Sequence, residues 1–237
     1  MRTTGESPAS AAPVSVVIPA FDAERYLADA LESVVGQTLP PAEVVVVDDG
    51  STDRTTAVAG SFGPLVRCVR RARGGPGAAL NTGIEHTRCE LLAFLDADDV
   101  WLPDKLAAQT RALSTDTDLD LVFGHVRQFR SPDLTPDEGA RIALRAGTQP
   151  GASKGTMLIR RGAFMRVGPF ATDLAAGEFV DWYARAIDAG LRGAMLPDVV
   201  MERRLHRSNT GARDRQAHQD YARVLRTVLE RRGVAGA

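Results

Sequence analysis

Three acids, Asp96, Asp98 and Asp99, follow directly after the apolar run LLAFL at residues 91–95. A packed core disfavours them, because burying a charge without a partner is costly. We expect the run to be a buried strand that delivers the acids to a cleft, where a divalent cation compensates them. Mg²⁺ is usually held by one or two carboxylates together with substrate phosphates, so the Asp-x-Asp pattern predicts chemistry on a phosphorylated substrate. The alternative is an acidic turn in which Asp99 or Asp104 caps the following helix.

A second acid cluster strengthens the first interpretation. Asp48 and Asp49 end the apolar run at residues 43–47 and are followed by Gly50. Ligand sites in α/β sheets lie at the carboxyl ends of strands. Two strands that end in acids therefore predict one shared site at that edge of the sheet. The alternative is that Asp48 and Asp49 cap the next helix.

The elements that must position these acids alternate along the first half of the chain. Apolar runs predict strands over residues 14–18, 43–47, 65–69 and 91–95, and helical spacing predicts helices over 24–35, 51–59, 76–86 and 103–113. Short apolar strands between helices are typical of a parallel sheet covered on both faces. The second half predicts strands at 119–129, 156–159 and 196–205, a long loop at 131–150, and helices at 178–189 and 216–232.

Composition limits the classes of protein. The 237 residues are 44% hydrophobic and 25% charged, which indicates one globular domain at 13–237 after a disordered tail at 1–12. The net charge of −1 gives no electrostatic case for nucleic acid. No apolar run reaches the length of about 20 residues needed to span a membrane. Two isolated cysteines suit a reducing compartment, so we expect a cytoplasmic protein. The only lysines among the 29 basic residues are Lys105 and Lys154.

Six stretches, in this order, resemble the family 2 glycosyltransferases. They are VSVVIPAFDAERYLADALESVVGQTLP (14–40), EVVVVDDGSTD (43–53), GPGAALNTGI (75–84), ELLAFLDADDVWLPDKL (90–106) and the weaker GEFVDWYARA (177–186) and RRLHRSN (203–209). The resemblance implies an α/β GT-A fold, with a mostly parallel, Rossmann-like sheet flanked by helices and an antiparallel C-terminal portion. It also implies a half at 13–113 that binds a nucleotide sugar and a half at 114–237, with the C-terminal helix, that binds the acceptor.

The same resemblance implies which residues contact the donor. We expect Asp49 to accept a hydrogen bond from uracil N3–H, so UDP is the expected nucleotide. Leu80 stands where the family often has an Arg, which removes one contact to the diphosphate. The full set of expected donor-binding residues is Pro19, Ala20, Phe21, Asp22, Asp49, Asn81, Asp96 and Ala97.

The metal site and the catalytic base are also implied by the resemblance. Asp98 and the late His206 are expected to hold Mn²⁺ or Mg²⁺. The family pattern Glu-Asp-x-Asp reads Glu178-Phe179-Val180-Asp181 here, so Phe179 replaces the expected base. Glu178 is the first choice for the base and Asp181 the second, because residues three apart share a helix face.

The expected reaction is an inverting, metal-dependent transfer of a sugar to an acceptor hydroxyl that the motifs do not identify. One alternative is a nucleotide-sugar-binding GT-A domain without transferase activity, which Phe179 and Leu80 motivate. Another is a sugar nucleotidyltransferase. That class usually has a Gly-rich loop bearing Arg or Lys after the first strand, and here the loop is Pro-Ala-Phe-Asp at residues 19–22.

Overall fold

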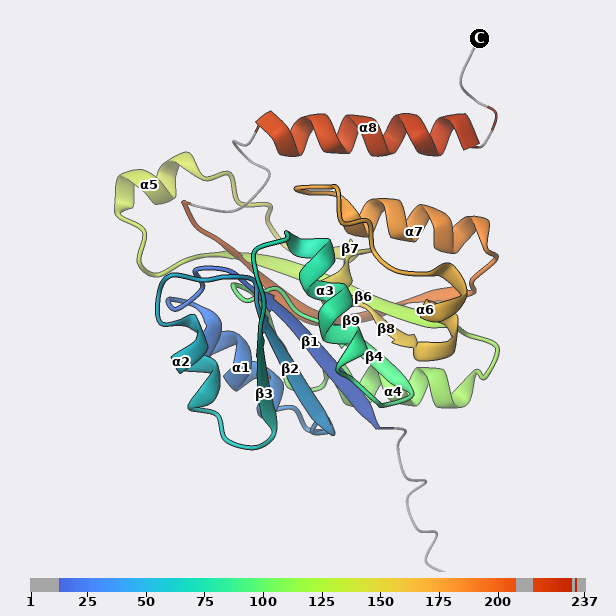
Figure 1. The fold of residues 1–237 in the computed structure, drawn as a ribbon, viewed down its shortest axis with the longest axis horizontal. Helices are drawn as coiled ribbons and strands as arrows, with labels where there is room; N and C mark the ends of the chain where they lie inside the picture. The colour runs from blue at the N-terminus through green and yellow to red at the C-terminus, as the bar shows by residue number, and fades with distance from the viewer. Residues whose placement is uncertain (1–12, 208–214, 232, 234–237) are drawn as a thin grey trace, which may run out of the picture.

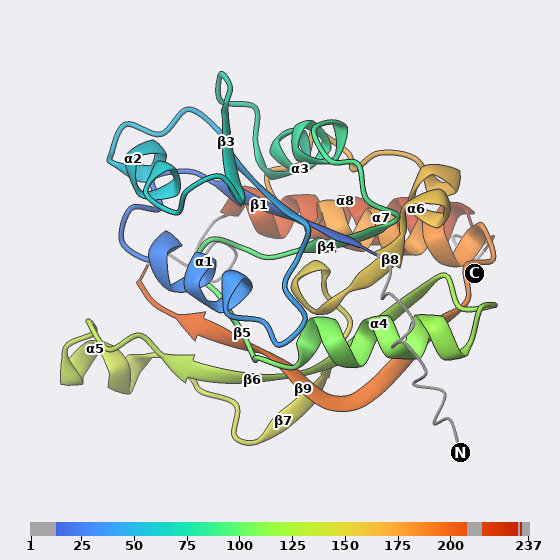
Figure 2. The same cartoon turned by 90° about the horizontal axis from the view of Figure 1, so that it is seen from below.

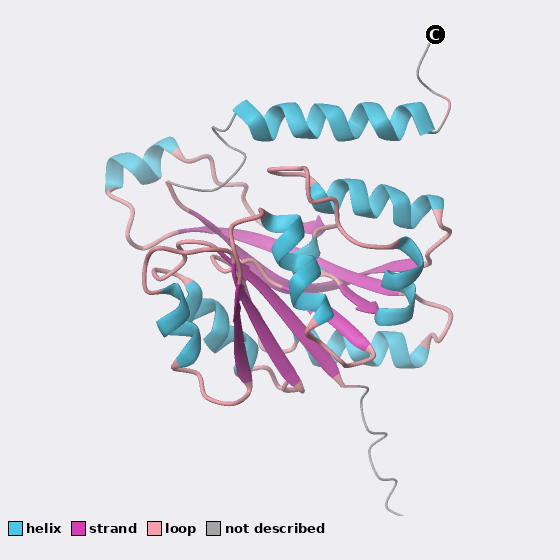
Figure 3. Cartoon of the chain, in the orientation of Figure 1, coloured by secondary structure: helices cyan, strands magenta, loops and turns pink. Residues whose placement is uncertain are grey.

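One mixed sheet of nine strands forms the centre of the molecule (Figure 1 and Figure 3). The computed structural model describes residues 13–207, 215–231 and 233. Along the sheet the strands follow the order β3-β2-β1-β4-β8-β6-β9-β5, and β7 pairs with β6. Their bounds are β1 Val14–Ala20, β2 Glu43–Asp48, β3 Val66–Arg70, β4 Leu91–Phe94, β5 Val100–Trp101, β6 Leu121–Arg130, β7 Thr148–Gly151, β8 Leu158–Arg160 and β9 Gly193–Leu205.

The predicted parallel part is confirmed at one side of the sheet. β1 lies between β2 and β4 and runs parallel to both, and β3 runs parallel to β2. β8 then inserts antiparallel between β4 and β6, while β9 runs parallel to β6 and antiparallel to β5. The α/β fold with an antiparallel C-terminal portion is therefore as expected.

Helices cover both faces of the sheet because the side chains of each strand alternate. On β1, Val16 and Ile18 belong to the core shared with α1 and α4, whereas Val17 packs with the core of α3, α6 and α7. Figure 2 shows α3, α6, α7 and α8 together on one side and α1 and α4 on the other. The helix bounds are α1 Leu27–Val35, α2 Thr55–Gly60, α3 Pro76–Glu85, α4 Lys105–Thr115, α5 Pro136–Arg141, α6 Arg161–Val167, α7 Glu178–Asp188 and α8 Arg215–Arg231, with a 3₁₀ turn η1 at Lys154–Thr156.

The long strand β9 connects the two halves of the chain at the site. Its residues Met201 and Glu202 pair with Trp101 and Val100 of β5, the two-residue strand that follows the acids after β4. β9 ends at Leu205, so His206 comes out beside those acids. A pairing of only two residues thus fixes the acid loop to the end of the chain's last strand.

The structure differs from the sequence predictions where local contacts outweigh periodicity. The helix predicted from residue 24 begins at Leu27, because Glu24 is tied to the next loop: its backbone N–H donates to Asp53 and its carboxylate accepts from the Arg54 N–H, both at 2.9 Å. The predicted loop at 131–150 contains α5, which Thr135 opens with a capping box, and the start of β7. The predicted tail at 1–12 and residue 232 lie outside the described residues. Within the described ranges, no helix combines the length and the apolarity needed to cross a membrane.

Candidate functional site

The two predicted acid clusters lie at the carboxyl ends of two parallel strands, β2 and β4. Asp48 ends β2, and Asp96, Asp98 and Asp99 follow β4, with β1 between the two strands. The acid loop is a tight turn, in which the Asp99 N–H donates to the Asp96 carbonyl at 3.1 Å. The predicted meeting of acids at one edge of the sheet is therefore present.

Asp98 forms a pair with His206. The His206 Nε2 and Asp98 Oδ2 atoms are 2.8 Å apart, and the Tyr26 ring packs on the imidazole with centroids 4.8 Å apart. Burial pushes the pKa of Asp98 up, but the bond to His206 and its charge bring that pKa below its usual value. The two residues expected to hold the metal are thus adjacent, although they are 108 residues apart in the chain.

Asp98 and His206 would hold a divalent cation only together with further ligands from the substrate. A carboxylate and an imidazole are both acceptable ligands for Mn²⁺. Within the described part of the chain, no group of three or more His, Cys, Asp or Glu side chains is arranged to hold a metal ion. Asp98 and His206 would therefore supply two ligands, and the phosphates of a donor the others.

Asp99 joins the acid loop to β9. Its carboxylate is buried and accepts a hydrogen bond from the Arg204 N–H at 2.9 Å. The Arg204 side chain also donates from Nε to the Asp98 carbonyl at 2.9 Å and pairs with Asp29 at 2.7 Å. Burial, with repulsion from Asp98 and Asp96, raises the pKa of Asp99 well above its usual value. Asp99 holds the loop against β9 and does not cap α4.

Lys154 occupies the space between Asp96 and Glu178, which sequence reasoning did not predict. Its ammonium is 3.2 Å from Asp96 Oδ1 and 2.9 Å from Glu178 Oε1. The Glu178 side chain is 6% exposed and that of Lys154 is 16% exposed. Burial alone would lower the pKa of Lys154, but Asp96 and Glu178 raise it above its usual value. Burial likewise pushes the pKa of Glu178 up, and Lys154 brings it below the usual range. The one feature of the sequence that could have drawn attention to Lys154 was the rarity of lysine in this chain.

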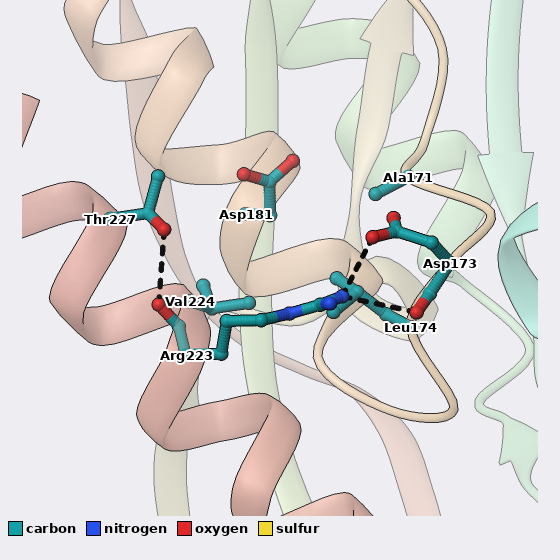
Figure 4. Close-up of a pocket in the computed structure, with 7 residues that line it drawn as sticks. All are labelled: Ala171, Asp173, Leu174, Asp181, Arg223, Val224 and Thr227. Carbon is teal, nitrogen blue, oxygen red and sulfur yellow. Dashed lines mark hydrogen bonds and ion pairs between the residues drawn. The ribbon is translucent and has the colours of Figure 1, made fainter.

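The structure separates the two candidates for the base. Glu178 points to Lys154 and Asp96, whereas Asp181 pairs with Arg185 at 2.9 Å. Asp181 also lines a cavity of about 300 Å³ beneath α8 (Figure 4), so the two acids have different surroundings, and the choice of base between them stays a prediction. The other lining residues are Ala171, Asp173, Leu174, Arg223, Val224 and Thr227.

Phe179 points into the core. Its ring stacks on Tyr183 at 5.7 Å between centroids and contacts the rings of Trp182 and Phe123. An Asp at this position would place a charge inside the aromatic cluster. Phe179 is therefore a packing residue here.

Asp48 and Asp49 have different environments. Asp48 is fully buried; its Oδ1 accepts from the Ser51 N–H at 2.8 Å, and it also bonds the Thr56 hydroxyl of α2. Asp49 instead faces the glycine loop before α3. It accepts from Arg71 Nη1 at 2.7 Å and from the N–H groups of Gly74 and Gly75, the latter at 2.8 Å. The Gly74 N–H lies 3.0 and 3.1 Å from the two oxygens, so each carboxylate oxygen already accepts two contacts. A ligand N–H would share an oxygen with these donors.

The turn after β1 lies against the Asp49 loop. The carbonyl of Ala20, whose neighbour is Pro19, accepts the Asp49 N–H at 2.8 Å. Asp22 adopts a left-handed φ of 45° and accepts the Thr52 N–H at 2.8 Å. Two predicted donor residues thus already bind the Asp49 loop through hydrogen bonds.

Phe21 carries the exposed aromatic surface of that turn. Phe21 is 40% exposed, and the Arg73 guanidinium lies 3.1 Å from the centroid of its ring.

Ala97 and Asn81 differ from this group. Ala97 is buried within the acid loop. Asn81 bonds the backbone of Phe170 twice: it donates to the carbonyl and accepts from the N–H, both at 2.9 Å. This geometry favours a structural role for Asn81, tying α3 to the loop before α7, over the donor contact that we expected.

Comparisons with known proteins agree with this geometry. The sequence model of glycosyl transferase family 2 matches residues 15–172. Glycosyltransferase AglE of Haloferax volcanii is 32% identical over 206 residues, which cover 79% of this chain and 65% of that protein. The chain spans less than two thirds of the length of the curated relatives that it matches, from 15% to 65%.

Two solved structures share the fold. A fragment of TarS of S. aureus, residues 1–349, in complex with UDP-GlcNAc superposes with a TM-score of 0.75 at 20% identity, covering 92% of this chain and 66% of that fragment. Mannosyltransferase PcManGT of Pyrobaculum calidifontis, in complex with GDP-Man and Mn²⁺, gives 0.63 at 23% identity, covering 95% and 65%.

The geometry of Asp99 predicts a pH-dependent stability. A carboxyl whose pKa is higher in the folded than in the unfolded chain contributes stability below the unfolded pKa of about 3.9 and loses it as the pH rises through the folded pKa. Asp99→Asn keeps an oxygen for the Arg204 N–H but carries no charge. In EDTA, it should stabilise the protein by on the order of 1 kcal/mol near pH 7 and by less near pH 4.

Urea unfolding across this pH range measures the difference. Asp104→Asn, an exposed acid bonded to Thr38, is the control and should show little change. A difference between wild type and Asp99→Asn that does not vary with pH would contradict the assigned environment of Asp99.

Proposed function

This chain belongs to glycosyl transferase family 2, and from that premise we propose that it transfers a sugar from a nucleotide diphosphate to an acceptor hydroxyl with inversion. The observation that carries the proposal is the arrangement of acids at the strand ends. Asp98 and His206 form one pair, and Asp96 and Glu178 are joined through Lys154. Residues suited to a donor thus lie next to a carboxylate suited to an acceptor.

The donor binds across the edge of the sheet in this proposal. The turn at residues 19–22 lies along the base and ribose, and the Asp49 carboxylate accepts from the base on an oxygen that it shares with the glycine loop. Because uracil presents an N–H at N3 and cytosine a lone pair, we propose UDP as the nucleotide. The two structural neighbours carry different nucleotides, so the assignment to UDP rests on Asp49 alone.

Asp98 and His206 would hold Mn²⁺ or Mg²⁺ together with the diphosphate. The cation supplies charge neutralisation for the leaving diphosphate. The residues prepare for this: Arg204 fixes the backbone of Asp98, and Tyr26 packs on His206.

Glu178 takes the proton of the acceptor hydroxyl. It lies at the first turn of α7, and Lys154 keeps it ionised and therefore able to accept a proton. A single carboxylate that activates the acceptor suits a direct displacement at the sugar carbon, which inverts its configuration. The alternative, a domain that binds nucleotide sugars without transferring them, is favoured by Phe179, whose side chain cannot act as a base.

UDP binding should require a divalent cation and Asp98. Calorimetry with UDP and Mn²⁺ should show that Asp98→Ala weakens binding by about 2 kcal/mol or more, since a charged contact is lost. Asp104→Ala is the matched control, because Asp104 is outside the site and bonds Thr38. Equal UDP affinity in Mn²⁺ and in EDTA would remove the metal from the mechanism.

Asp49 should set the preference for the base. UDP should bind more tightly than CDP or GDP, and Asp49→Asn should reduce that preference by about 1–3 kcal/mol, because one of the two acceptor oxygens becomes an NH₂ donor and the glycine loop competes with N3–H for the other. We prefer Asn to Ala, since the Asn oxygen can still accept from Arg71 or the glycine loop. Competition binding measures the effect, and full discrimination by the variant would limit Asp49 to holding the loop.

Glu178→Gln should lower kcat by roughly 10²–10⁴, the usual contribution of a general base. Donor affinity should change little, because the proton comes from the acceptor. Asp181→Asn should have a smaller effect, since Asp181 pairs with Arg185 and lines the cavity under α8. Release of UDP from UDP-sugars, with a panel of acceptor glycans and lipids, measures turnover.

The reverse ranking of these two variants would move the base to Asp181. Wild-type protein that binds UDP-sugars and transfers to no acceptor would favour the binding domain without transferase activity.

A further inference from the structure

Lys154 lies where the proposed donor and acceptor sites meet. Its ammonium bridges Asp96 at 3.2 Å and Glu178 at 2.9 Å. Under the proposed function, Asp96 faces the donor and Glu178 the acceptor, so the transferred sugar must pass between them. A cation at this point is within reach of the donor itself.

The turn that carries Lys154 is held by buried polar side chains. Three consecutive carbonyls each accept one hydrogen bond: Gly155 from Trp101 Nε1 at 2.8 Å, Thr156 from Gln109 Nε2 at 2.7 Å, and Met157 from Lys105 Nζ at 3.3 Å. Lys105 also donates to Gln109 Oε1 at 2.6 Å, so these side chains form one network.

This network is costly, which indicates that the position of the turn matters. Lys105 is buried, and burial lowers its pKa well below the usual value. At Gly155 a Cβ atom would lie 2.5 Å from the Met201 sulfur, so any side chain there would displace Met201. Both lysines of the chain thus serve one turn, with Lys105 fixing the backbone and Lys154 reaching into the site.

The ammonium has more donors than its two carboxylates use. Lysine has three N–H donors, and Asp96 and Glu178 take two of them. A nucleotide diphosphate would bring further negative charge next to Asp96, Asp98 and Glu178. A cation held among these acids by the fixed turn offsets that charge.

We propose that Lys154 is a donor-binding residue, whose ammonium donates to a phosphate or sugar oxygen of the nucleotide sugar while it bridges Asp96 and Glu178. The inference rests on the proposed function and adds a residue to it. It also gives Lys154 a role beyond that of a counter-ion for the buried Glu178.

Calorimetry in Mn²⁺ with UDP, UDP-N-acetylglucosamine and GDP-mannose tests the contact. Lys154→Met should weaken the binding of the nucleotide that wild type binds by about 10- to 100-fold. Lys154→Arg should retain part of the affinity. Loss of affinity for UDP itself assigns the contact to the phosphates, and loss for the sugar nucleotide only assigns it to the sugar. Arg166→Met, which breaks an ion pair with Asp120, is the control and should bind as wild type.

A double variant separates donor binding from a structural role. Lys154→Met alone leaves the Glu178 carboxylate buried without its cation, which destabilises a fold. The combination of Lys154→Met with Glu178→Gln removes both charges, and thermal unfolding verifies that it folds. Donor binding about 10- to 100-fold weaker than that of Glu178→Gln alone supports the inference.

Equal affinity of the double variant and Glu178→Gln would show that Lys154 is only a counter-ion, and would overturn the inference while the proposed function stands. Wild-type protein that binds none of the three nucleotides in Mn²⁺ would overturn the proposed function first, and this inference with it.

Discussion

Compensation of negative charge at one edge of the sheet is the constraint on which the site depends. β4 delivers Asp96, Asp98 and Asp99 to a position where only Asp96 and Asp98 keep appreciable side-chain exposure, at 39% and 31%. Each acid has a different partner: Asp96 pairs with Lys154, Asp98 with His206, and Asp99 with a backbone N–H of β9. Each partner lies more than fifty residues further along the chain than the acid that it compensates.

Because of this, the second half of the chain completes the site that the first half begins. β5 pairs with β9 immediately after the acids, and Arg204 extends from β9 under the acid loop to Asp29 of α1. The Arg204 guanidinium also packs between the rings of Tyr26 and Phe129, 4.9 and 4.8 Å from their centroids. A change in β9 would therefore act on Asp98 and His206 through the acid loop.

The elements that could be predicted are those with a run or a repeating pattern of apolar residues, and those whose end is marked by acids. Buried runs such as residues 43–47 show the parallel strands, and acids after them show the edge that holds the site. β5 could not be predicted, since a strand of two residues has no period, and its existence depends on β9. The capping box of Thr135, by contrast, was a local signal within the predicted loop that could have revealed α5.

The site was predictable where a residue follows a strand and less so where it depends on packing. Asp98 and His206 could be paired by resemblance, and the structure places them 2.8 Å apart. Spacing on a helix suggested one role for Glu178 and Asp181, but the aromatic contacts of Phe179 turn α7 so that only Glu178 reaches Lys154. The position of Lys154 follows from the hydrogen bonds to residues 155–157, which no linear pattern encodes.

The central claim is that these paired acids form a donor site completed by a cation. Anomalous diffraction from crystals grown with UDP and Mn²⁺ tests it most directly. The account predicts a manganese peak in coordination contact with the Asp98 carboxylate, His206 Nε2 and the diphosphate, with the uracil beside Asp49. A peak at any other residues, or UDP bound at that edge of the sheet without manganese, would contradict it.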